Sequence, residues 1–258
     1  MKKLFLLFCL VALTLGIKAQ NQVTLRDVSR GTYRASNIYG IKPMLDGQYY
    51  TQISPDRKRI VKYSFKTGKQ VEAIFDVEKA RDCTLKYFDD YIMSPDEKLI
   101  LIQTKTRSIY RRSFTAEYYI YNVKNNTIEP LSKNGPQQVP LFSPDGFQVA
   151  FVRNNNIFLV KLLFGNSESQ ITKDGEYNKV LNGIPDWVYE EEFGFNRAFD
   201  FSADSKMIAY IRFDESQVPM YKFPLYKGMN PEYTEFATYP GEYTYKYPKS
   251  GEVNSTVS

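Results

Sequence analysis

The chain has 258 residues, with 34 lysines and arginines against 29 acidic residues, two cysteines and no histidine. Without histidine it cannot hold a Ser-His-Asp triad within these residues, and histidine and cysteine are too scarce for a zinc site. We therefore expect no metal ion and no other cofactor.

Residues 1–19 are typical of an export signal. Two lysines precede an apolar run, residues 4–15, which has the length of a signal-peptide core and is too short to span a bilayer as a helix. We expect cleavage after Ala19, in preference to a lipoprotein anchor at Cys9, and no membrane span elsewhere. The expected compartment is the periplasm, with secretion or the cell surface as alternatives.

Removal of residues 1–19 leaves 31 basic against 29 acidic residues, a net charge of +2. Such a balance gives no reason to expect a nucleic-acid partner. Cys83 is then the one remaining cysteine, so an internal disulfide is excluded and packing alone must stabilise the fold.

A repeat runs through residues 20–258. Turn sequences recur at spacings of 40, 49 and 59 residues: Ser54-Pro55-Asp56, Ser94-Pro95-Asp96, Ser143-Pro144-Asp145 and Ser202-Ala203-Asp204. A strand-like run follows each turn, at residues 59–61, 98–102, 148–152 and 206–211, and aromatic-rich second strands are clearest at 118–123 and 156–160. Short strands at this period predict an all-β fold, with about four blades of a β-propeller. A twisted β-sandwich is the alternative.

The first candidate binding residue is Arg111, within the segment Ile109–Tyr118. If this segment is a strand, Arg111 and Arg112 point to opposite faces, so at most one of them lines a cavity. A guanidinium can hold the backbone carbonyl of a bound peptide through two hydrogen bonds. The alternative is a surface arginine paired with Glu117 or with solvent.

The segment 186–192 contains the only tryptophan, followed closely by three consecutive glutamates. A glutamate run alone is typical of a solvated helix face. Here the aromatic neighbours lower the hydration of the carboxylates, which favours a compensating cation such as a peptide α-ammonium with its three donors. Glu191 and Glu192 can converge only on a helical turn or an irregular loop, for which Asp186 is a suitable N-cap.

After Pro219 the composition changes, with seven tyrosines interspersed with four prolines up to Pro248. This sequence is too aromatic for a flexible linker, so we expect residues 219–250 to form an extended arm that packs against another surface. The last repeat is incomplete at Ser258, which indicates a truncated part of a larger protein.

Several segments together resemble the dipeptidyl peptidase IV family, in the same order and at similar distances. They are Asn182–Phe193, Tyr110–Ala116, Ala209–Glu215 with Val218–Pro219, and Tyr247–Asn254. The resemblance covers most of residues 90–257. The serine elbow of the Gly-Trp-Ser-Tyr-Gly-Gly type, and the aspartate and histidine of the family's triad, do not occur in the chain.

By this resemblance, Glu191 and Glu192 bind the free α-amine of a peptide substrate and Arg111 holds a substrate carbonyl. Cleavage then follows the second residue, with proline or alanine preferred there. The resemblance implies a serine on a separate α/β-hydrolase domain, which this chain lacks, an eight-bladed propeller, and a homodimer formed through the arm after Pro219. The chain alone should be inactive. The alternatives are a non-catalytic periplasmic propeller that binds peptides or a protein partner, and a family member that has lost its function.

Overall fold

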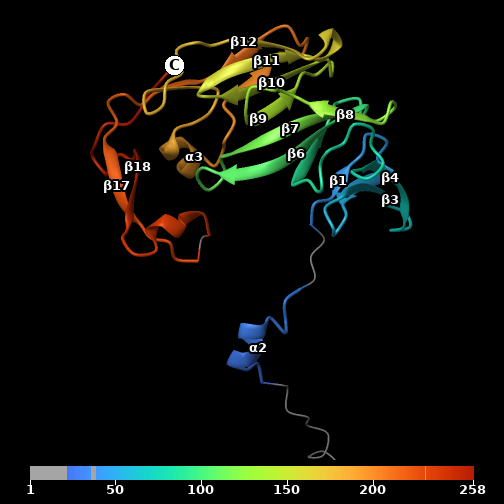
Figure 1. Ribbon diagram of the computed structural model, residues 1–258, viewed down its shortest axis with the longest axis horizontal. Helices are drawn as coiled ribbons and strands as arrows, with labels where there is room; N and C mark the ends of the chain where they lie inside the picture. Colours follow the sequence, from blue (N-terminus) through green and yellow to red (C-terminus); the bar gives the residue numbers. More distant parts are fainter. Residues whose placement is uncertain (1–21, 36–38, 230) are drawn as a thin grey trace, which may run out of the picture. The chain divides into compact units, whose positions relative to one another are not determined.

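The computed structural model describes residues 22–35, 39–229 and 231–258 (Figure 1). The expected export signal, residues 1–19, lies outside the described residues. The chain divides into two compact units, residues 1–40 and 41–258. Within the described residues, no helix combines the length and the apolar character that a bilayer crossing requires.

The first unit contains helix α2 (Leu25–Arg30). The side chain of Thr24 accepts a hydrogen bond from the Asp27 amide, and the Asp27 carboxylate accepts one from the Thr24 amide, which forms a capping box. The helix ends at Gly31, whose φ of 67° lies in the left-handed region that favours glycine.

The second unit begins with three four-stranded antiparallel sheets, in each of which the strands follow one another in chain order (Figure 1). The first sheet contains β1 (Lys42–Pro43), β2 (Tyr49–Ile53), β3 (Arg59–Ser64) and β4 (Gln70–Asp76). The second contains β5 (Asp90–Met93), β6 (Leu99–Ser108), β7 (Phe114–Asn122) and β8 (Thr127–Pro130). The third contains β9 (Gln138–Phe142), β10 (Gln148–Arg153), β11 (Asn156–Lys161) and β12 (Ser167–Gln170).

The Ser-Pro-Asp turns connect β2 to β3, β5 to β6 and β9 to β10. In the second sheet the Ser94 hydroxyl donates to the Asp96 carboxylate at 2.8 Å and accepts from the Leu99 amide at 2.9 Å. Equivalent bonds from serine to aspartate occur in the turns that begin at Ser54, Ser143 and Ser202. The side chains thus close the turn from inside, which explains why serine and aspartate recur at these positions.

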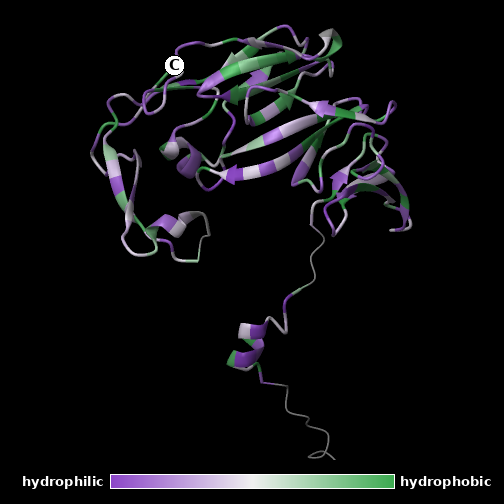
Figure 2. Ribbon diagram, in the orientation of Figure 1, coloured by the Kyte–Doolittle hydropathy of each residue, from purple (hydrophilic) through white to green (hydrophobic). Residues whose placement is uncertain are grey.

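Successive sheets pack against one another through hydrophobic clusters, so the central strands of the second and third sheets are covered on both sides. The hydropathy colouring in Figure 2 shows hydrophobic stretches on the strands of the third sheet. On β6, Ile100 and Ile102 pack toward the first sheet and Leu101 packs toward the third, and all three are fully buried. Each such side chain contributes about 1.5–3 kcal/mol of hydrophobic stabilisation. This arrangement confirms the all-β propeller fold and excludes the β-sandwich alternative.

The strands of a fourth blade are less regular. β14 (Phe199–Phe201) pairs with β15 (Ile208–Tyr210), whereas β16 (Arg212–Asp214) lies between β13 (Val180–Asn182) and β19 (Thr256–Val257). The strand predicted over residues 206–211 after the Ser202 turn is confirmed as β15, although the observed strand is shorter. The chain changes partners at Ile211, whose amide donates to Ala198 and whose carbonyl accepts from Gly183.

In the described part of the chain, the remaining connections contain two 3-10 helices and a hairpin. The 3-10 helix η1 (Leu162–Phe164) connects β11 to β12. Beyond Pro219, β17 (Met220–Leu225) and β18 (Gly241–Lys246) form an antiparallel hairpin, with the 3-10 helix η2 (Pro231–Phe236) between them. The segment expected to be an extended arm is thus a hairpin in which Phe223 stacks on Tyr245, with ring centroids 5.6 Å apart.

Candidate functional site

The glutamate run lies on helix α3 (Trp187–Phe193), in the connection between β13 and β14 (Figure 1). One carboxylate oxygen of Asp186 accepts a hydrogen bond from the Tyr189 amide at 2.9 Å, and the other accepts the Ser255 hydroxyl. Gly194, with a φ of 76°, ends the helix. The expectations of a helical turn and of an Asp186 N-cap are both confirmed.

The three glutamates have different environments. Glu190 is buried, with 1% of its surface exposed, and one of its oxygens accepts from the amides of Arg112 and Ser113 at 2.7 and 2.9 Å. Glu191 is 15% exposed through its side chain and lies 2.7 Å from Nε of Arg111. Glu192 is exposed. The run is therefore not a uniformly solvated helix face.

Arg111 and Arg112 lie in the loop between β6 and β7, which pair as far as Ser108 and Phe114. The placement of these arginines on a strand is therefore wrong. Both face α3: Arg111 forms the ion pair with Glu191, and the Arg112 guanidinium lies so close to Gly194 that a Cβ there would be 3.5 Å from Nη2. A loop allows this convergence because its side chains need not alternate between two faces.

The alternative pairing of Arg111 with Glu117 is also wrong. Glu117, on β7, forms an ion pair with Lys105 at 2.9 Å. The structure instead brings Arg111 and Glu191 into direct contact although 80 residues separate them in the sequence. Two of the three residues named from the sequence therefore touch, and Glu192 lies on the same helix.

Aromatic side chains of the hairpin border this site. Trp187 packs on Tyr247 with ring centroids 4.5 Å apart, and Tyr245 lies 6.1 Å from Trp187 and 5.7 Å from Tyr110. Burial raises the pKa of Tyr245, and the nearby negative charge of Glu191 contributes in the same direction. Tyr245 could not be identified from the sequence, because the hairpin contains several tyrosines and its composition does not indicate which of them faces α3.

Residues 94–258 match the family model described as the dipeptidyl peptidase IV (DPP IV) N-terminal region. The chain belongs to the dipeptidyl peptidase IV family. The crystal structure of Porphyromonas gingivalis dipeptidyl peptidase 4 superposes with a TM-score of 0.82 and 44% identity, over 93% of this chain and 33% of that one.

Curated members of the dipeptidyl peptidase IV family are also similar. Human prolyl endopeptidase FAP is 32% identical over 91% of this chain and 29% of its own length. The probable dipeptidyl-aminopeptidase B of Trichophyton verrucosum (strain HKI 0517) is 40% identical over 64% of this chain and 19% of its own length. The chain thus spans less than a third of the length of these curated relatives.

A buried carboxyl group, Glu215, lies just after β16 and is 6% exposed. Burial raises its pKa to about 7, and the charge of Asp186, the N-cap of α3, acts in the same direction. The ammonium of Lys246 opposes this shift, and it donates to the carbonyls of Ser216 and Val218. Glu215 therefore prefers the protonated form in the folded chain below neutral pH.

We expect Glu215 to make the folded chain less stable as the pH rises. The folded pKa lies above the unfolded value of about 4.5, so the folded state binds more protons between the two, and stability falls from about pH 4.5 to about pH 7. The loss attributable to this group is up to about 3 kcal/mol. Urea unfolding across this range should show a steeper decline for the wild type than for Glu215→Gln. If the free energy of unfolding fell equally with pH in the wild type and in Glu215→Gln, the raised pKa of Glu215 would be contradicted. Glu129→Gln is the control: Glu129 is exposed on β8, so this variant should show the same pH dependence as the wild type.

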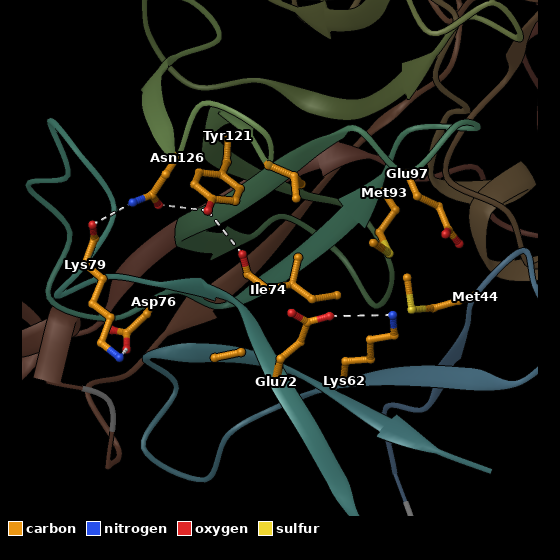
Figure 3. A pocket seen from close by; sticks show the side chains of 12 residues that line it. Met44, Lys62, Glu72, Ile74, Asp76, Lys79, Met93, Glu97, Tyr121 and Asn126 are labelled. Atoms are coloured by element: carbon orange, nitrogen blue, oxygen red, sulfur yellow. Dashed lines mark hydrogen bonds and ion pairs between the residues drawn. The ribbon is translucent and has the colours of Figure 1, made fainter. Parts of the chain in front are cut away.

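A pocket of about 540 Å³ opens between the first and second sheets, away from the residues named above (Figure 3). Its charged side chains include Lys62 and Glu72, which form an ion pair with 3.6 Å between Nζ and Oε1. The Tyr121 hydroxyl, also in this pocket, donates a hydrogen bond to the Ile74 carbonyl at 3.1 Å. In the part of the chain that the structure describes, no group of three or more histidine, cysteine, aspartate or glutamate side chains could hold a metal ion.

Proposed function

We propose that the chain is the substrate-anchoring part of an exported serine dipeptidyl peptidase, in which Glu191 and Glu192 bind the α-amine of a peptide. The observation that carries this proposal is the ion pair of 2.7 Å between Arg111 and Glu191, beside the exposed Glu192 on the same helix. Within the described residues, the ion pair with Arg111 is the one that these two carboxylates form, and the net negative charge that remains on them suits an added cation. An α-ammonium offers three donors for these acceptors.

Arg111 has a second role in this proposal. Its Nε atom is directed to Glu191, while the side chain as a whole is 73% exposed. The Nη atoms are therefore accessible to a backbone carbonyl of the bound peptide, as the fork geometry of a guanidinium allows. Amine and carbonyl anchors together would fix both the direction of the peptide and the position of its first residue.

Anchoring of the amine determines where the bond breaks. With the N-terminus fixed, a nucleophile at a constant distance cleaves after the second residue and releases X-Pro or X-Ala dipeptides. The 258 residues contain no histidine, so a serine nucleophile and its base must come from outside them. On this proposal the chain alone binds such peptides without hydrolysing them.

The hairpin after Pro219 is the proposed homodimer contact. It exposes large apolar side chains, among them Tyr226 at 64% and Tyr239 at 79%. Burial of such rings against a second copy would remove apolar surface from water, and aromatic residues are enriched at interfaces of this kind. The proposed compartment is the periplasm.

The function is tested by blocking the amine. In the protein expressed from its natural reading frame, we expect an Ala-Pro chromogenic amide to be cleaved, and its N-acetyl form to be cleaved at least about 100-fold more slowly, because acetylation removes the charge that the carboxylates bind. Equal cleavage of the two substrates would overturn the proposal. Binding of the free-amine dipeptide without hydrolysis would instead support a non-catalytic peptide-binding propeller.

A further inference from the structure

We infer that Glu190 is a positioning residue, which holds the Arg111 loop against α3 and thereby sets the place of the Arg111 guanidinium in the amine site. The inference rests on the proposed function of Arg111 and Glu191. Glu190 is not itself expected to touch the peptide, since 1% of its surface is exposed.

The contacts of Glu190 are specific to the loop between β6 and β7. Its Oε1 atom accepts hydrogen bonds from two consecutive backbone amides, those of Arg112 at 2.7 Å and Ser113 at 2.9 Å. Hydrogen bonds to an ionised acceptor are stronger than those between neutral groups, and two convergent donors compensate a charge that would otherwise be costly to bury. The Glu190 carboxylate thus fixes the position of the backbone immediately after Arg111 through these two hydrogen bonds.

A second contact holds the same loop from the far end of α3. The Asn196 side chain, two residues after the helix-ending Gly194, donates to the Arg112 carbonyl at 3.0 Å. The peptide group on each side of the Arg112 Cα is therefore bound to the α3 segment, one through its N–H and the other through its carbonyl. These contacts restrict the backbone conformations of the neighbouring Arg111. Its side chain is therefore held within reach of Glu191.

The inference assigns different tasks to adjacent glutamates. Glu190 points into the protein and binds backbone, whereas Glu191 points to Arg111 and Glu192 is exposed. Residues on a helix differ in direction by about 100° per position, so consecutive side chains can serve an interior and an exterior surface at once. A purely structural role for Glu190 would predict lower stability with unchanged peptide binding.

Two substitutions separate these roles. Glu190→Gln retains a side-chain oxygen that can accept from both amides, whereas Glu190→Leu has a similar size and no acceptor. In the 258-residue chain, hydrogen exchange of the Arg112 and Ser113 amides should accelerate at least about tenfold in Glu190→Leu and change little in Glu190→Gln. Thermal unfolding of both variants establishes that the comparison is made on folded protein.

Peptide affinity is the second readout. Trp187, the only tryptophan, lies on α3, so its emission can follow titration with the dipeptide Ala-Pro. We expect the dissociation constant to rise at least about tenfold in Glu190→Leu and to return to within about threefold of the wild type in Glu190→Gln. N-acetyl-Ala-Pro provides the control ligand.

The outcomes distinguish this inference from the proposed function. Unchanged exchange at Arg112 and Ser113 in Glu190→Leu would overturn the inference, whatever the dipeptide does. Faster exchange with unchanged affinity would also overturn it, provided that Glu191→Gln does weaken binding. If Glu191→Gln leaves the affinity unchanged as well, the amine site itself fails, and faster exchange still supports the hold of Glu190 on the loop.

Discussion

Glutamine at either Glu191 or Glu192 should reduce kcat/KM for free-amine X-Pro substrates by about 10- to 100-fold or more in the protein expressed from its natural reading frame. Each substitution removes a charge from the pair proposed to bind the α-ammonium while it keeps the size of the side chain. Hydrogen bonds to charged groups contribute about 1.5–3 kcal/mol, and every 1.4 kcal/mol corresponds to a factor of ten. Misplacement of the scissile bond adds to the loss.

Steady-state kinetics on both variants checks this expectation. Glu129→Gln is the matched control, because Glu129 is an exposed glutamate on β8, the last strand of the second sheet, and should retain wild-type kinetics. Both α3 variants should discriminate less than the wild type between the free and the acetylated amine, because each retains only one carboxylate of the pair. Wild-type kcat/KM in both variants would eliminate the glutamate pair as the amine anchor.

Phe151→Ala should be among the most destabilising substitutions in the chain, with a loss of about 3–5 kcal/mol in the free energy of unfolding. Phe151 is fully buried on β10, and its ring stacks on Phe158 at a centroid distance of 5.7 Å and an interplanar angle of 7°. The guanidinium of Arg153 lies over the Phe158 ring at 4.1 Å. Truncation therefore leaves a cavity between the second and third sheets and removes a stacked pair.

Urea unfolding at neutral pH measures this loss. Phe147→Ala serves as the control, since Phe147 lies in the turn before β10 and is 49% exposed, and we expect a change of about 0.5 kcal/mol or less. A loss below about 1 kcal/mol for Phe151→Ala would mean that the neighbouring sheets close over the cavity and that packing between blades is more adaptable than this structure indicates.

The blades were predictable because their signals are local. A turn of fixed composition precedes a strand that is apolar on both faces, as Ile100, Leu101 and Ile102 show on β6. The strand predicted over residues 206–211 is present as β15, but no pattern in the sequence indicated that it ends at Tyr210 and that a new strand with different partners begins at Arg212. This change of partner strand depends on hydrogen bonds to backbone groups of residues far away in the sequence. A local sequence pattern does not indicate such bonds.

The candidate site was predictable only in part. The carboxylate run, the helical turn and the Asp186 N-cap follow from spacing and side-chain chemistry. The hydrogen bonds that the Arg112 and Ser113 amides donate to Glu190 connect positions 78 and 77 residues apart, and the amide groups of a loop have no signature in the sequence. The approach of Tyr245 to Trp187 depends in the same way on where the hairpin lies.

The order of the strands also has a consequence for how the protein folds. Each of the first three sheets is built from consecutive strands, so its contacts are short-range and it can form as soon as its own segment of chain is available. The sheet of β13, β16 and β19 instead joins residues from 180 to 257, across the whole hairpin. Closing so long a loop is slow relative to forming a local hairpin. The segment that carries α3 is therefore expected to become ordered late, after the blade that supplies Arg111 already exists.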